Sequence, residues 1–438
     1  MKNDIDLFYE NIGKRGVKPG LERVKPLLRA LGNPESGLKI IHVAGTNGKG
    51  SIISFASSVL AEDGCKVGAF TSPYLIRVNE MFQIYNDDNS AEARRAGGDL
   101  AGGRPISDED YDRLSLKIKN LIETDAELSS LELTLFEIQT GLALLYFYEQ
   151  KCDFIFLEAG LGGRMDATNA PGNTLISVIG KISYDHMDIL GDDIKDIISE
   201  KLGIIKPGSE VVIAPQDPDI QKIIMEMIAG KYPESIDKVH IALALQSSVE
   251  ISLLGDHQKE NAAAAIKIIE CLRIKGYHIS EENLKKGLYN AKWPCRLELI
   301  HDDPEIYVDA AHNADGAKAM ADFFKLKLKA EADLKQVTFI FGVLKDKEYE
   351  KMVLHIKPIA KKAYTVTPEN ERALPAHELT AVLKKLDIES YTCKSIEEAI
   401  EKCMEDTGSI CVFGSLFFVG YAKKIILQNL TKFSLKIL

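Results

Sequence analysis

A short glycine-rich segment has the residue types of a phosphate-binding loop. Residues 44–51 read Ala-Gly-Thr-Asn-Gly-Lys-Gly-Ser. Glycines let backbone N–H groups converge on phosphate oxygens without Cβ clashes, and the start of a helix adds the positive end of its dipole. We expect Lys49 to contact the β- and γ-phosphates of ATP and the Ser51 hydroxyl to reach Mg²⁺. The candidate ATP-binding residues in this segment are Thr46, Asn47, Gly48, Lys49, Gly50 and Ser51.

The flanking residues supply the context that such a loop requires. Lys39–Val43 has the composition of a strand, and Ile52–Leu60 has the pattern of a helix. The segment departs from the common pattern at Ala44, where a glycine is usual, and at Gly50, which separates the lysine from the serine. The alternative is a glycine-rich turn between strand and helix that binds no ligand.

Three polar side chains at the ends of predicted strands are candidate metal ligands. Ser72, Glu158 and His186 each follow such a strand. The carboxyl ends of parallel strands meet along one edge of a sheet, so these groups can converge. Carboxylate and hydroxyl oxygens suit Mg²⁺, and one imidazole is tolerated. The alternatives are that Glu158 is an ordinary turn residue and that His186 is structural.

Lys201 interrupts an apolar helix face. Residues 194–205 have a helical pattern, and Ile194, Ile197, Ile198 and Ile205 make one face that also includes Lys201. Burying an ammonium is costly. The lysine could extend to solvent or pair with a carboxylate. Alternatively, burial depresses its pKa, and the neutral amine reacts with CO₂ to form a carbamate that coordinates Mg²⁺ beside Glu158.

Short apolar runs alternate with amphipathic stretches along the chain. Runs that are apolar on both faces are typical of parallel strands covered by helices, so the sequence predicts an α/β fold. A boundary is expected at Trp293–Arg296, where Pro294 stops the preceding element. We expect an N-terminal P-loop ATPase-like domain with a mostly parallel sheet (residues 1–295) and a smaller C-terminal Rossmann-like α/β domain (residues 296–438). The predicted strands are Lys39–Val43, Val67–Phe70, Phe154–Leu157, Leu175–Ile179, Val211–Ala214, Ile306–Val308, Val337–Phe341 and Ile410–Phe413.

Composition excludes several classes of function. The formal net charge of −11 argues against binding to nucleic acid or an anionic membrane. The seven scattered cysteines indicate reduced thiols in a cytoplasmic protein. The N-terminus has no apolar signal core, and the longest apolar stretch, near residues 410–422, is too short to span a membrane. Asp87–Arg104 is polar and glycine-rich, which predicts a surface loop or, around Ala91–Ala96, a short helix.

The block His42–Ser51 resembles the P-loop of the Mur ligase superfamily and, within it, of folylpolyglutamate synthases and dihydrofolate synthases. Further blocks follow in the order that this family shows, over nearly the whole chain. They are Ser72–Leu75, Thr134–Glu137, Glu158–Asn169, Asp185–His186 with Leu190–Gly191, Glu200–Lys206, Gly255–Gln258 with Asn261–Ala262, Trp293–Arg296, Asp309–Asn313 and Gly414–Ser415.

The resemblance implies an ATP-dependent, ADP-forming ligase that adds L-glutamate to tetrahydrofolate or another folate through an acyl phosphate. Dihydropteroate is a second candidate acceptor. The resemblance also implies two Mg²⁺ sites, one at the P-loop and one at Ser72, Glu158, His186 and a carbamylated Lys201. We also expect a monovalent cation as a further cofactor. The protein is expected to be monomeric and cytoplasmic, with no nucleic-acid or membrane partner.

In the C-terminal domain, which the resemblance makes the glutamate-ligase domain, three residues are assigned roles. Arg296 would contact phosphate from across the cleft, Asp309 would bind near the ribose or orient the domain, and His312 would meet the incoming glutamate. Asn261 and, as a weaker candidate, Gln258 would lie at the adenine pocket. An interdomain salt bridge of Arg296 and a helix-capping role of Gln258 are the alternatives.

Four positions depart from the family pattern. Tyr74 stands for a histidine, Met81 for an arginine, Cys295 for a glycine and Ala310 for a glycine. Tyr74, Met81 and the long loop lie close in sequence to the expected pterin site, so the folate form stays open. Two other functions are alternatives. A cell-wall ligase needs a UDP-sugar domain before the P-loop, and a P-loop switch leaves Glu158 and Lys201 unexplained.

Overall fold

The computed structural model describes residues 4–86, 102–185, 191, 193–245, 249–329, 337–404 and 408–434. The chain forms two compact units. Unit 1 comprises Met1–Ser252 and Lys259–Lys292, and unit 2 comprises Leu253–Gln258 and Trp293–Leu438. The division into domains at residues 295 and 296 stays a prediction.

A single sheet with a parallel centre organises unit 1. Its strand order is β4-β3-β2-β5-β1-β6-β7-β8. The strands from β2 to β8 in this order run parallel, whereas β3 pairs antiparallel with β2, and β4 with β3. The strands are β1 Ile40–Ala44, β2 Val67–Phe70, β3 Phe82–Tyr85, β4 Arg104–Pro105, β5 Phe154–Glu158, β6 Thr174–Ile179, β7 Glu210–Ile213 and β8 Val239–Ile241.

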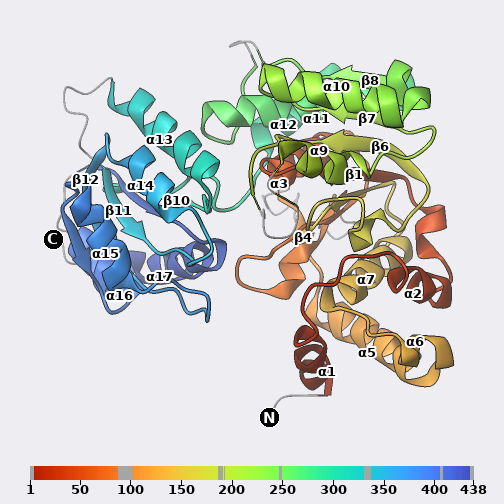
Figure 1. The fold of residues 1–438 in the computed structure, drawn as a ribbon, viewed down its shortest axis with the longest axis horizontal. Coiled ribbons are helices and arrows are strands. Elements are labelled where there is room, and N and C mark those ends of the chain that lie inside the picture. Colours follow the sequence, from red (N-terminus) through yellow and green to blue (C-terminus); the bar gives the residue numbers. More distant parts are fainter. Residues whose placement is uncertain are drawn as a thin grey trace. The chain divides into compact units, whose positions relative to one another are not determined.

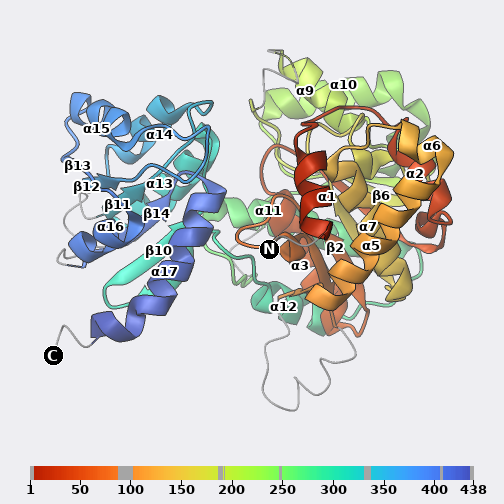
Figure 2. The same cartoon turned by 90° about the horizontal axis from the view of Figure 1, so that it is seen from below.

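Helices cover both faces of this sheet (Figure 1). They are α1 Asp4–Gly13, α2 Val24–Ala30, α3 Lys49–Glu62, α5 Asp108–Thr124, α6 Ala126–Ser130, α7 Leu135–Glu149, α9 Ile194–Leu202, α10 Pro218–Lys231, α11 Asp256–Ile274 and α12 Glu281–Asn290, with the 3₁₀ turns η1 Pro34–Gly37, η2 Val78–Met81, η3 Ala167–Asn169 and η4 Pro233–Lys238. Helices α1, α5 and α7 lie side by side (Figure 2). Together with α2 and strands β1, β2 and β5, they enclose one hydrophobic core cluster, which includes Phe70, Leu142, Phe147 and Ile155.

Unit 2 is built on a smaller sheet with the strand order β13-β12-β11-β14-β10-β9. All neighbours are parallel except β9, which pairs antiparallel with β10. The strands are β9 Glu298–Asp302, β10 Glu305–Asp309, β11 Val337–Phe341, β12 Ala360–Thr365, β13 Ser390–Thr392 and β14 Ile410–Phe413. The helices are α13 Ala314–Leu328, α14 Tyr349–Ile356, α15 Ala376–Lys385, α16 Ile396–Cys403 and α17 Leu416–Ser434.

The fold confirms the predicted α/β class and corrects several boundaries. Each of the eight predicted strands is present, to within one residue at each end. Helix α9 ends at Leu202 instead of Ile205, because Gly203 forms its C-cap. Helix α11 begins at Asp256, which places Gln258 in its first turn and Asn261 in its second. Arg104 belongs to β4, and the rest of the predicted loop, up to residue 101, lies outside the described residues.

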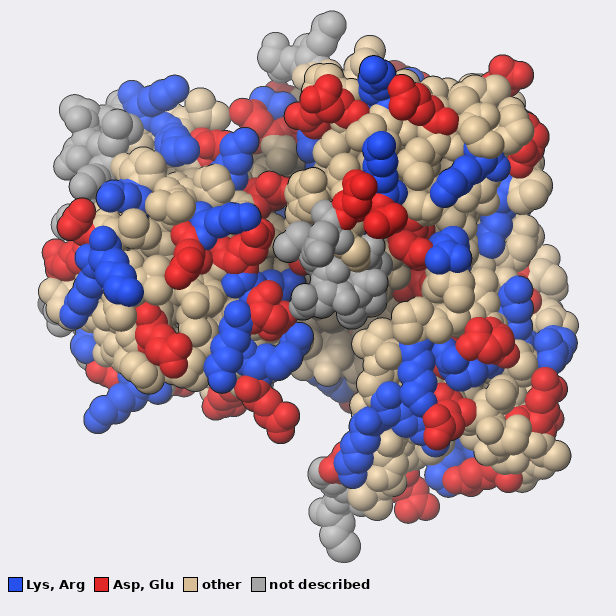
Figure 3. Space-filling model, viewed as in Figure 1, with Lys and Arg blue, Asp and Glu red and all other residues tan. Residues whose placement is uncertain are grey.

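The distribution of surface charge and the composition of the helices bear on the predicted partners. Lys and Arg side chains alternate with Asp and Glu side chains over both units in the face that Figure 3 shows. None of the helices in the described part of the chain is long and apolar enough to cross a membrane.

Candidate active site

The P-loop lies at the centre of the larger sheet. Strand β1, which leads into it, is flanked by β5 on one side and β6 on the other. The chain leaves the carboxyl ends of these three strands at Ala44, Glu158 and Ile179. Open parallel sheets bind ligands at such an edge. The central position of β1 therefore lets neighbouring strands place side chains beside the loop.

The segment after β6 holds the P-loop in place. The backbone N–H of Thr46 donates to the Lys181 carbonyl at 2.8 Å, and the Thr46 hydroxyl donates to the Ser183 carbonyl at 3.0 Å. The Ser183 N–H donates back to the Thr46 hydroxyl at 3.1 Å. Gln216, after β7, fixes the same turn by accepting from the N–H of Ile182 at 3.0 Å. The conformation of the loop is thus set by three strands before any ligand binds.

Gly48 and Asn261 meet at the start of α3. Gly48 is the N-cap of α3 and has a φ of 82°, a left-handed conformation that favours glycine. A Cβ at this position would lie 2.2 Å from Oδ1 of Asn261. The structure therefore brings Asn261 against the P-loop, and a side chain at residue 48 would displace it.

Lys49, Glu158 and Ser72 come together. Nζ of Lys49 lies 3.7 Å from Oε1 of Glu158 and donates to the Gly45 carbonyl at 3.0 Å. The other carboxylate oxygen of Glu158 accepts the backbone N–H of Ser72 at 3.1 Å. Ser51, in the first turn of α3, is buried. A cation, a carboxylate and two hydroxyls are therefore gathered around one sheet edge.

This donor set fits a hard divalent cation such as Mg²⁺. The carboxylate of Glu158 is buried and lies beside Ser72, and oxygen ligands are those that Mg²⁺ prefers. His186, the predicted third ligand, lies outside the described residues. Within the described ranges, no three His, Cys, Asp or Glu side chains gather to hold a metal ion. The predicted metal ligands that the structure describes are therefore Ser51, Ser72, Glu158 and Lys201, and their role stays a prediction.

Lys201 is buried in α9 with only 4% of the residue exposed, on the same face as Ile197 and Ile198. Burial, and next the nearby Lys49 ammonium, lower the pKa of Lys201 to about 7. No hydrogen bond or ion pair to its ammonium is found among the described residues, although Asp185 is close enough to favour the charged form. Burial and this lowered pKa fit the predicted neutral amine better than extension of the side chain into solvent.

The glycine-rich loop 159–166, between Glu158 and η3, packs directly on α9. A Cβ at Gly163 would lie 2.8 Å from the Glu200 carbonyl, and one at Gly203 would lie 2.3 Å from Cβ of Arg164. Arg164 pairs with the carboxylate of Glu200 at 2.6 Å. Glycines at these two positions thus allow the loop to sit against the turn that carries Lys201.

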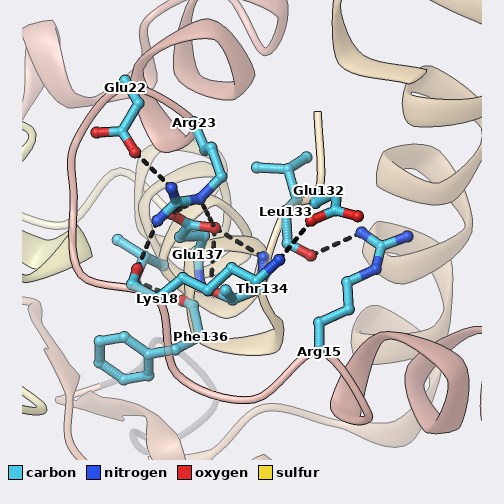
Figure 4. A network of polar contacts seen from close by, with 10 residues as sticks. Arg15, Lys18, Glu22, Arg23, Glu132, Leu133, Thr134, Phe136 and Glu137 are labelled. Carbon is cyan, nitrogen blue, oxygen red and sulfur yellow. Dashed lines mark hydrogen bonds and ion pairs between the residues drawn. The ribbon is translucent and has the colours of Figure 1, made fainter. Parts of the chain in front are cut away.

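An ion-pair network ties the N-terminal segment 15–23 to the start of α7 (Figure 4). Arg23 pairs with the buried Glu137 at 3.0 Å, and Glu137 also accepts from the N–H and the hydroxyl of Thr134 at 2.7 and 2.9 Å. The segment also contacts the glycine-rich loop, where the Gly20 N–H donates to the Met165 carbonyl at 3.0 Å. Phe136, at the start of α7, packs against the same loop, since a Cβ at Gly160 would come within 2.7 Å of its ring.

In unit 2, Asp309 ends β10 and uses both carboxylate oxygens locally. Oδ2 accepts the N–H of Leu297 and Oδ1 accepts the N–H of Ala311, each at 2.7 Å. Burial raises the pKa of Asp309, and the Arg296 guanidinium opposes this effect. These bonds fix the backbone next to Arg296 and His312, and both predicted roles of Asp309, near the ribose or in orienting the domain, stay predictions.

His312 lies in the turn between β10 and α13. Its Nδ1 is 3.0 Å from the Ala310 carbonyl. Because a carbonyl only accepts, Nδ1 carries the hydrogen, and in the neutral ring the lone pair is on Nε2. Asn313 caps α13 by accepting the Gly316 N–H at 2.8 Å. The turn thus presents an imidazole that can accept a proton through Nε2.

Sequence reasoning gave no role to several residues that organise the site. Lys181 and Ser183 hold the P-loop through backbone groups, which no residue pattern reveals. The Gln216 side chain holds the turn that contains Lys181. Asp166 lies inside a block with a recognisable pattern, and its position two residues before Thr168 is typical of a local hydrogen-bonded turn.

Known proteins resemble the chain in sequence and in fold. Residues 295–416 match the glutamate ligase domain of the Mur ligases. The dihydrofolate synthase/folylpolyglutamate synthase of Bacillus subtilis is 35% identical over 436 residues, which covers 94% of this chain and 96% of that protein. The folylpolyglutamate synthase of Lacticaseibacillus casei is 29% identical over 429 residues, with 92% and 94% covered.

Solved structures agree with this relationship. Mycobacterium tuberculosis folylpolyglutamate synthase complexed with ADP superimposes with a TM-score of 0.81 at 25% identity, covering 96% of this chain and 97% of that one. E. coli FolC in complex with DHPP and ADP gives a TM-score of 0.80 at 25% identity, with 97% of each chain covered. With 35% identity over almost the full length of both sequences and a shared two-unit fold, the chain belongs to the dihydrofolate synthase/folylpolyglutamate synthase family of Mur ligases.

Proposed function

We propose that this protein is an ATP-dependent ligase that joins L-glutamate to a folate and releases ADP and phosphate. The observation that carries the proposal is the meeting of the P-loop Lys49 with Glu158, 3.7 Å apart, beside the buried Lys201. The relatives named for this activity are similar over almost the whole chain, which supports the assignment of the folate substrate.

The proposed reaction has two steps. A folate carboxylate oxygen attacks the γ-phosphorus of ATP, the bond from that phosphorus to the bridging oxygen breaks, and an acyl phosphate and ADP form. The neutral amine of glutamate then attacks the acyl carbon, the C–O bond to phosphate breaks, and an amide and inorganic phosphate form. The amine loses one proton, for which Nε2 of His312 in unit 2 is the proposed acceptor.

The residues of unit 1 act on the phosphates. The P-loop N–H groups and the Lys49 ammonium balance the negative charge of the transferring phosphoryl group. Ser51 would hold one Mg²⁺, and Ser72, Glu158, His186 and a carbamate on Lys201 would hold a second. Such ions screen the repulsion between the carboxylate and the triphosphate. Asn261, Arg296 and Asp309 complete the proposed ATP site.

The burial and lowered pKa of Lys201 support the proposed carbamate. A neutral amine adds to CO₂ and loses a proton, which converts a potential cation into an anion. The pKa of about 7 makes the neutral form abundant at physiological pH, and a carboxylate-like group suits Mg²⁺. The same modification would satisfy a buried side chain that has no ion-pair partner within the described part of the chain.

The test is ADP release with ATP, Mg²⁺, L-glutamate and either tetrahydrofolate or dihydropteroate, each substrate being omitted in turn. A ligase releases ADP at full rate only when acceptor and glutamate are both present, and the product gains one glutamate by mass. Slow hydrolysis that is indifferent to both substrates would instead indicate a nucleotide switch. The comparison of the two acceptors decides whether the protein acts on dihydropteroate as well.

A further inference from the structure

A buried histidine on β1 contacts the 3₁₀ turn η3, which follows the glycine-rich loop. His42 is the single polar side chain of β1, between Ile41 and Val43, and it is fully buried. Its register partners are Leu157 on β5 and Ser177 on β6. Burial lowers the pKa of His42 to about 3, so the ring is neutral at physiological pH. An apolar residue would fill this position of a central strand without the cost of burying a polar ring.

The ring starts a chain of hydrogen bonds that ends at the backbone N–H of Leu161. Nε2 of His42 lies 2.8 Å from the Thr168 hydroxyl, and that hydroxyl donates to Oδ1 of Asp166 at 2.5 Å. Oδ1 also accepts the Thr168 N–H at 3.0 Å, and Oδ2 accepts the Leu161 N–H at 2.9 Å. Leu161 is three residues after Glu158.

The directions of these bonds fix the tautomer of His42. Burial raises the pKa of Asp166, but hydrogen bonds from Thr168 and from the backbone N–H of Leu161 oppose this effect, and N–H groups approach both carboxylate oxygens, the arrangement that an ionised carboxylate accepts. The Thr168 hydrogen therefore points to Asp166, and its oxygen is left to accept. His42 must then carry its hydrogen on Nε2. Nδ1 bears the lone pair, and this buried atom has no hydrogen-bond partner in the described structure.

Burying Nδ1 without a partner has a cost that an apolar residue at position 42 would avoid. A buried polar atom without a partner costs about 1–3 kcal/mol. Such atoms are rare in native proteins. Histidine at this position thus has an unsatisfied Nδ1 but donates a hydrogen bond from Nε2 to Thr168.

We propose that His42 is a positioning residue for the reaction: through Thr168 and Asp166 it fixes the glycine-rich loop between Glu158 and Lys201. The loop lies against the Lys201 turn at Gly163 and follows Glu158 directly, so its position sets the distance between these two side chains. The inference rests on the proposed ligase function for its effect on the rate, but the hydrogen-bond chain itself does not.

The decisive comparison is between His42→Gln and His42→Phe. Glutamine can place an N–H where Nε2 of the ring lies, whereas phenylalanine keeps the volume and removes the donor. Ser177→Ala is the matched control, because this buried serine is the register partner of His42 on β6. Its hydroxyl bonds to the Ile204 carbonyl and to Ser209, so it takes no part in the hydrogen bonds from His42 to Leu161. Thr168→Val removes the middle link.

Two measurements on the nucleotide-free protein do not depend on activity. In ¹⁵N-histidine spectra of the wild type, the signal that His42→Gln removes should have the shifts of a neutral Nε2–H ring at pH 7. Hydrogen exchange of peptides covering residues 159–166 should speed up in His42→Phe and Thr168→Val but stay near wild type in His42→Gln and Ser177→Ala. An Nδ1–H tautomer, or unchanged exchange in both disrupted variants, would overturn the chain.

The rate then tests the positioning role. Removing a partner that orients a ligand typically lowers activity by 10- to 100-fold, so we expect kcat of His42→Phe to fall by about tenfold or more while KM for ATP changes little. His42→Phe combined with Thr168→Val should be no slower than either alone, because both break one chain. Faster exchange with an unchanged kcat would overturn the positioning role. A wild type without ligation would refute the proposed function, whereas the exchange result would still decide the hydrogen-bond chain.

Discussion

Lys201→Met should stabilise the protein at low pH, and the gain should shrink as the pH rises. Below pH 7 the folded chain must hold the Lys201 ammonium in a buried site, whereas the unfolded chain hydrates it. Burial lowers the pKa from 10.5 to about 7. Between these values the unfolded state binds more protons than the folded state, so the stability of the wild type increases with pH across this window.

The pKa values give the expected size. At 1.36 kcal/mol for each tenfold change, a fall from 10.5 to about 7 amounts to about 5 kcal/mol of lost stability at pH 6. At pH 9 the folded amine is already neutral, and about 2 kcal/mol remains because the unfolded lysine is still protonated. Methionine is unbranched and apolar and can follow the path of the lysine stem. The variant should therefore gain up to these amounts.

The assay is thermal unfolding at pH 6 and pH 9 in CO₂-free buffer, since a carbamate would remove the buried cation. Lys195→Met, at an exposed position of the same helix, should stay within about 0.5 kcal/mol of the wild type at both pH values. A Lys201→Met protein that is less stable than the wild type at pH 6, or a gain that does not shrink at pH 9, would refute the reasoning about this lysine.

Three further outcomes follow from the same contacts. Lys49→Ala should abolish ligation while the fold persists, and retention of more than about a tenth of kcat, a loss below about 1.4 kcal/mol, would contradict its role at the phosphates. Lys201→Ala should lose activity, and short carboxylic acids should partly restore it by replacing the carbamate; a bare ammonium in crystals grown with ATP, Mg²⁺ and bicarbonate would argue against the modification. Arg23→Met should destabilise unit 1 by about 3 kcal/mol because it leaves the buried Glu137 carboxylate unpaired, whereas Arg29→Met, at an exposed pair with Glu127, should cost under about 1 kcal/mol in the same unfolding assay.

The central strands could be predicted because each is a short apolar run, and their burial on both faces confirms the reason. Strand β12 was missed because Ala360–Thr365 includes two adjacent lysines, which mask the apolar pattern. Edge strands such as β4 and β9 are short, or only half apolar, and depend on their neighbour for hydrogen bonds. Propensity alone does not identify such strands, since tertiary pairing decides them.

The same distinction holds for the site. Lys49, Glu158 and Ser72 could be placed together because each follows a parallel strand, and parallel strands share one ligand edge. The burial of Lys201 could be predicted from helical spacing. The sequence does not predict that backbone amides bind Asp309, that Arg23 pairs with Glu137 or that His42 bonds to Thr168. These partners are brought together by the fold, and the last two pairs are 114 and 126 residues apart.

The most direct test of the central claim is the transfer of oxygen from folate to phosphate. Tetrahydrofolate with ¹⁸O in its terminal carboxylates is incubated with the protein, ATP, Mg²⁺ and L-glutamate, and the released phosphate is analysed by mass. If an acyl phosphate forms and glutamate displaces it, each phosphate carries one ¹⁸O and each amide product has lost one. Unlabelled phosphate, or label released without an added glutamate, would contradict the account.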